Sequence, residues 1–60
     1  MKDLKAELEK LLVNAEDCEL IARLATDNAK RATFGRIAVQ LREMAAGLKA
    51  DIAAREANLA

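Results

Sequence analysis

Apolar residues recur along the first 25 positions at spacings that alternate between four and three. This stripe consists of Leu4, Leu8, Leu11, Ala15, Cys18, Ala22 and Ala25. Such an alternation is the heptad spacing of a helix that packs against another helix. The pattern therefore predicts a helix over about residues 2–25, with large side chains in its first half and small ones in its second.

A second helical pattern occupies about residues 28–58. Its large side chains recur at spacings of three and four, at Phe34, Ile37, Leu41, Met44 and Leu48. Roughly opposite lies a series of almost entirely small residues: Ala32, Gly35, Val39, Ala46, Ala50, Ala53 and Ala57. Small side chains let helices approach closely. This small-residue series is therefore either a partner surface or exposed alanine that serves helix propensity.

The segment Thr26–Asn28 (Thr-Asp-Asn) separates the two patterns. Short polar side chains bond nearby backbone groups, which disfavours helix interiors and favours N-caps. We predict a tight turn here, and hence an all-α, antiparallel two-helix hairpin forming one domain, residues 1–60. Because the turn has neither Gly nor Pro, a single unbroken helix stays open as an alternative. So does a break near Phe34 with a third helix from Arg36, since Gly35 weakens a helix.

Folding the second helix back on the first brings the two large-residue stripes together. The helix–helix interface predicted in this way consists of Leu4, Leu8, Leu11, Ala15, Cys18, Phe34, Ile37, Leu41, Met44 and Leu48. Further apolar residues, Val13, Leu20, Ile21 and Leu24, lie off this interface. A chain this short buries only about 60% of its unfolded surface and is marginal alone. We therefore expect two hairpins to pair by two-fold symmetry into a four-helix bundle.

Charge is balanced overall but unevenly distributed. Ten basic and ten acidic residues leave no net charge, which favours neither nucleic acid nor an anionic membrane. Residues 1–20 hold six acidic residues against three lysines, and residues 21–49 hold six basic against two acidic. Paired helices would neutralise one another. Four basic residues also gather around the turn: Arg23, Lys30, Arg31 and Arg36. Such a cluster can bind phosphate backbones, although no exposed aromatic residue is available to stack on bases.

The sequence offers no catalytic constellation. Cys18 is the one classical nucleophile, and the chain has no His to activate it. A free Cys on a helical stripe behaves as a small core hydrophobe, and an intersubunit disulfide or redox thiol is the alternative. The carboxylates of Glu16, Asp17 and Glu19 are expected to face solvent. We predict no enzyme, no metal, no cofactor and no small-molecule substrate.

Part of the chain resembles a type of short helical protein of alphaproteobacteria. The resemblance covers Cys18-x-x-x-Ala22-x-x-Ala25-Thr26-Asp27, then Arg31, then Leu41-x-x-Met44-Ala45. It implies a hairpin and a bacterial origin, and those proteins carry no assigned activity. The design also resembles plasmid-encoded hairpin dimers that bind paired RNA loops, in architecture alone.

The chain has no apolar run long enough to span a membrane and no secretory signal, so we expect a cytoplasmic protein. The function predicted is a homodimeric interaction, adaptor or regulatory module, whose partners are a second copy of the chain or a helix of another protein. The alternative is a nucleic-acid-binding hairpin dimer that uses the basic cluster around the turn.

Overall fold

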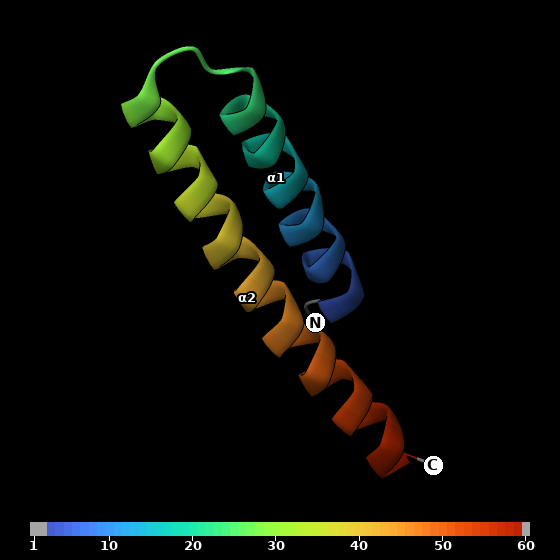
Figure 1. Cartoon of the computed structure of the whole chain (residues 1–60). Coiled ribbons are helices and arrows are strands. Elements are labelled where there is room, and N and C mark those ends of the chain that lie inside the picture. Colours follow the sequence, from blue (N-terminus) through green and yellow to red (C-terminus); the bar gives the residue numbers. More distant parts are fainter. Residues whose placement is uncertain (1–2, 60) are drawn as a thin grey trace.

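The computed structural model describes residues 3–59, and the side chains of residues 3–58. Within this range the chain forms two α-helices, α1 (Leu4–Leu24) and α2 (Asn28–Leu59), and no strand. The helices run antiparallel, side by side, and α2 continues well past the amino end of α1 (Figure 1). The predicted all-α hairpin is therefore confirmed. Lys2, where we expected the first helix to begin, lies outside the described residues.

Asp3 caps the amino end of α1. Its Oδ1 accepts hydrogen bonds from the backbone N–H groups of Lys5 at 3.0 Å and Ala6 at 3.4 Å. These N–H groups have no partner inside the helix, so an acidic cap satisfies them and also complements the helix dipole. The first backbone bond of the helix runs from Glu7 N–H to the Asp3 carbonyl at 3.1 Å.

The turn contains Ala25, Thr26 and Asp27. Ala25 is extended, with φ −68° and ψ 135°, which ends α1. Asp27 then caps α2, because its Oδ1 accepts the N–H of Ala29 at 2.9 Å and its carbonyl accepts the N–H of Arg31 at 2.9 Å. The second helix begins at Asn28 as predicted, whereas the first ends at Leu24, one residue earlier than predicted, so Ala25 belongs to the turn. Among the described residues no backbone φ is positive, so this turn has no need of glycine.

The alternative topologies are both wrong. The break after Leu24 excludes one unbroken helix, and α2 passes through Gly35 and Gly47 without interruption. A Cβ placed on either glycine would meet no other atom within 4 Å. Close packing within the hairpin therefore explains neither glycine.

The centre of the hairpin is built from alanine. Ala15, Ala38 and Ala45 are buried, and among the described side chains no larger one is fully buried. The leucines of the predicted interface, such as Leu11 and Leu41, are only half-buried. Two helices can cover a large side chain on one flank and not on the other. The result is a rod with Cα extents of 49 × 16 × 14 Å and a thin core.

One residue of the predicted interface does not pack inside the hairpin. Met44 is 57% exposed, whereas its neighbour Ala45 is 3% exposed. Neighbouring helical positions are about 100° apart, so only one of the two can face α1. The small residue occupies the position of closest approach, where a methionine side chain would hold the helices apart.

Candidate interaction surfaces of the hairpin

One side of the hairpin is closed by charged side chains. The guanidinium of Arg42 reaches from α2 to Glu19 on α1, with Nε 2.7 Å from Oε2 and Nη2 2.8 Å from Oε1. Lys5 Nζ lies 3.4 Å from Glu56 Oε2 further along. We call the side that carries these two contacts the charged side. Both contacts bridge α1 and α2, so this side is tied across the helix pair.

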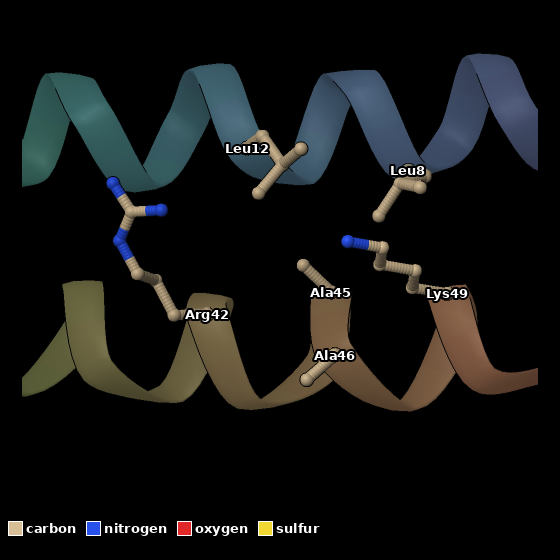
Figure 2. A pocket seen from close by; sticks show the side chains of 6 residues that line it. All are labelled: Leu8, Leu12, Arg42, Ala45, Ala46 and Lys49. Atoms are coloured by element: carbon tan, nitrogen blue, oxygen red, sulfur yellow. The ribbon is translucent and has the colours of Figure 1, made fainter.

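A shallow groove of about 220 Å³ runs along the charged side. It is lined by Leu8, Leu12, Arg42, Ala45, Ala46 and Lys49. Figure 2 shows Lys49 extending from α2 toward Leu8, with Leu12 across from Ala45. Long basic side chains thus lie over an apolar floor, where their stems cover it and their charges reach water.

The contact between Glu19 and Arg42 shifts the pKa of each side chain in the direction that favours its charged form. Hydrogen bonds from Arg42 lower the pKa of the Glu19 carboxyl, partial burial opposes this, and the charges of Arg42 and Arg23 add to the lowering. The hydrogen bonds and charge of Glu19 raise the pKa of Arg42. Glu19 was expected to face solvent with Glu16 and Asp17. The side chain of Glu19 is 43% exposed, so it does meet solvent, but it also pairs with Arg42, which the sequence did not indicate.

The opposite side of the hairpin is apolar. Helical spacing of about 100° per residue sets six side chains on it, away from Glu19 and Arg42. We call this the apolar side, and it consists of Leu4, Leu11, Cys18, Ile37, Met44 and Leu48. Five of these are half-buried and Met44 is exposed. The hairpin therefore leaves a two-helix-wide apolar strip open along one flank.

The remaining predicted interface residues are Leu8 and Ala15 from α1 and Phe34 and Leu41 from α2. Ala15 is buried and the other three are half-buried. Phe34 and Leu41 stand at heptad spacing from Leu48, so they share its face of α2 and border the apolar side.

A second exposed apolar surface lies on the back of α1, turned away from α2. It contains Val13, Leu20, Ile21 and Leu24, with exposed fractions of 51%, 45%, 38% and 70%. We call it the outer face of α1. Lys10 and Asp17 are exposed among these residues and interrupt the apolar surface. The corresponding outer face of α2 is the predicted small-residue series, which is exposed apart from half-buried Gly35 and carries Val39 as its large residue.

The four basic residues near the turn come from both helices. Lys30, Arg31 and Arg36 follow one another on α2 at intervals that turn them in three different directions. Arg23 belongs to the last turn of α1, where it complements the helix dipole. The guanidinium of Arg31 donates from Nη2 to the Ala25 carbonyl at 2.8 Å. Arg31 therefore holds the end of α1, a role that its position near the start of α2 did not suggest.

Comparisons with known proteins identify no relative of this chain. No helix in the described part of the chain is long and apolar enough to cross a membrane. Over the same residues, no three His, Cys, Asp or Glu side chains gather as metal ligands. Searches of the chain against protein-family models, curated proteins and solved structures give no match.

Proposed function

We propose that this chain is a small interaction module that works as a homodimer of hairpins in a four-helix bundle. The observation that supports this proposal most directly is the solvent-accessible area of the hairpin. The hairpin exposes 4771 Å² at a mass of 6.5 kDa, whereas a compact monomer of that mass exposes roughly 3,800 Å². The excess, about 1,000 Å², is comparable with the roughly 800 Å² that each partner buries in a standard interface.

The burial pattern supports the same proposal. The core of the hairpin is three alanines, and burying an alanine removes little apolar surface from water. The half-buried leucines would add their remaining exposed surface to the core only when another chain covers them. Packing against a second hairpin is the route by which small helical domains of this kind gain a sufficient core.

The proposal includes no catalysis. The sequence contains no His, and the sole Cys lies on a helix face among apolar residues. With the bundle formed, the outer face of α1 would stay exposed and could receive a helix of another protein. We propose the cytoplasm as its location, since a free Cys suits a reducing compartment.

Sedimentation equilibrium of the purified chain at micromolar concentration tests the proposal. We expect the mass of two chains. The mass of one folded chain would overturn the homodimer. The nucleic-acid alternative is checked on the same sample by absorbance at 260 nm, because the chain has no Trp or Tyr to contribute there. Co-purifying nucleic acid would favour that alternative, which the divergent directions of Lys30, Arg31 and Arg36 make less suited to the geometry.

A further inference from the structure

The two flanks of the hairpin differ in what a second molecule would meet. Both ion pairs that bridge the helices among the described side chains lie on the charged side. The apolar side offers leucine, isoleucine, cysteine and methionine from both helices instead. Covering the charged side would desolvate paired ions, which rarely improves stability. Covering the apolar side removes half-exposed hydrocarbon from water, which does.

We propose that the apolar side is the surface on which a second copy of this chain packs, with α1 of each copy against α2 of the other. This inference rests on the self-association proposed above and adds its surface and its arrangement. The second copy fits because the area that the hairpin leaves exposed in excess is that of one half of a standard dimer interface.

Charge decides which helices face each other. From Leu4 to Leu24, α1 has five acidic and three basic residues, a net of −2. From Asn28 to Leu59, α2 has six basic and three acidic residues, a net of +3. Pairing α1 with the second copy's α2 sets opposite charges together, whereas pairing like helices would oppose like charges. A two-fold axis parallel to the helices gives this arrangement, and all neighbouring helices are then antiparallel.

The hairpin itself sets the position of each residue along its long axis, which we call the height of the residue. Leu12 lies across from Ala45 (Figure 2). Because the helices are antiparallel, moving six residues forward from Leu12 on α1 corresponds to moving six residues back from Ala45 on α2. Cys18 is therefore at the height of residue 39, close to Ile37. A parallel two-fold axis preserves heights, so small Cys18 meets the second copy's Ile37. Leu11 meets the second copy's Met44 in the same way, which gives Met44 the cover that it lacks in the hairpin.

The outer faces are poorer candidates for this contact. The outer face of α1 is one helix wide and is interrupted by Lys10 and Asp17. The outer face of α2 is a series of small residues with Val39 as its large side chain. Val39 and Met44 are each 57% exposed on the same helix. They therefore provide a matched pair of positions that differ in the face they occupy.

The first experiment compares Met44→Lys with Val39→Lys by sedimentation equilibrium, with helix content followed by circular dichroism. We expect Met44→Lys to raise the dimer Kd at least about 30-fold, the effect of an interface hot spot. Val39→Lys should leave the Kd within a few-fold of the wild-type value. Loss of the dimer with Val39→Lys and its retention with Met44→Lys would overturn the proposal.

A second experiment does not depend on placing a charge in the interface. The wild-type chain is mixed with a Cys18→Ala/Ile37→Cys chain, so that each chain carries one cysteine, and the mixture is mildly oxidised. We expect a disulfide between the two kinds of chain, because a disulfide needs Cα atoms within about 7 Å. A Cys18→Ala/Val39→Cys chain is the matched control and should form none. Absence of the Ile37→Cys link in a dimeric sample would overturn the arrangement.

The outcomes separate this inference from the proposed function. If the wild-type chain sediments as a monomer, the homodimer itself fails. If the wild-type chain is a dimer that Met44→Lys leaves intact, the homodimer stands and the assignment of its surface fails.

Discussion

Glu19 and Arg42, which are 23 residues apart in the chain, form a two-point contact that joins the second half of α1 to the middle of α2. Two nitrogens of the planar guanidinium, Nε and Nη2, each donate to one carboxylate oxygen, a bidentate geometry that adds specificity. Along the sequence of α2, Arg42 lies between Val39 and Ala46 of the small-residue series. It ties the charged side of the hairpin.

This pair predicts a pH dependence. The pKa of Glu19 is lowered in the folded chain, so its stabilising contribution is present above its unfolded-state pKa and is lost as pH falls through the folded-state pKa. Glu19→Gln should therefore lower the urea midpoint at neutral pH and have no such effect in acid below that pKa. Urea unfolding at one fixed chain concentration measures both conditions.

Glu16→Gln is the control for this experiment. Glu16 is exposed and precedes Glu19 by one turn of α1. Its substitution should move the midpoint little at either pH. If both variants behaved alike at neutral pH, the contact between Glu19 and Arg42 would contribute nothing specific.

The cap of α2 gives a second prediction. Asp27→Ala removes the oxygen that accepts the Ala29 N–H, and should cost about 1 kcal/mol of unfolding free energy. Asp27→Ser keeps an oxygen acceptor and should retain most of the stability. Chemical denaturation of the three chains side by side decides this. Equal losses for Ala and Ser would mean that the cap hydrogen bond is unimportant.

Much of this architecture depends on interactions between residues that are close together in the chain, and the sequence alone predicts that part. The Thr26–Asn28 segment predicts the turn because capping depends on residues two or three positions away. The choice between Met44 and Ala45 for the closest contact depends on the rotation of α2 about its axis, which a broad apolar stripe leaves open. The Arg42 contact depends on helix register, and the Arg31 bond to the Ala25 carbonyl depends on the path of the turn. Neither has a signal in residue spacing.

The two glycines of α2 predict gains in stability. Gly47→Ala should stabilise the chain by about 1 kcal/mol, since the added methyl meets no atom within 4 Å and alanine is the better helix former. Gly35→Ala should do the same, because the outer face of α2 is free in the proposed dimer. Thermal unfolding of both variants measures the gain. A loss of stability with Gly35→Ala alone would indicate that another helix approaches there.

Truncating side chains on the inner and outer faces of α2 should lower the unfolding free energy by different amounts. Leu41→Ala should cost about 2 kcal/mol, near the low end for leucine truncation, because Leu41 is only half-buried in the hairpin. Val39→Ala, on the exposed outer face of the same helix, should change the unfolding free energy by about 0.5 kcal/mol or less. Urea denaturation compares the two variants. Equal effects would contradict the assignment of inner and outer faces of α2.

Cys18 reports on the apolar side without any substitution. It is half-buried in the hairpin, and the proposed dimer covers it further. Its reaction with dithionitrobenzoate should therefore slow as the chain concentration rises through the dimer Kd, while helix content is monitored in parallel. A rate that is independent of concentration while the dimer fraction changes would place Cys18 outside the interface.

In the proposed dimer, association supplies the core that the hairpin lacks. Thermal unfolding followed by circular dichroism, over about a 100-fold range of chain concentration, tests it most directly, because a dimer's Tm depends on concentration by mass action. The account predicts a Tm that rises steadily with concentration. A cooperative transition with the same Tm throughout would show a hairpin that is stable by itself, and would contradict the account.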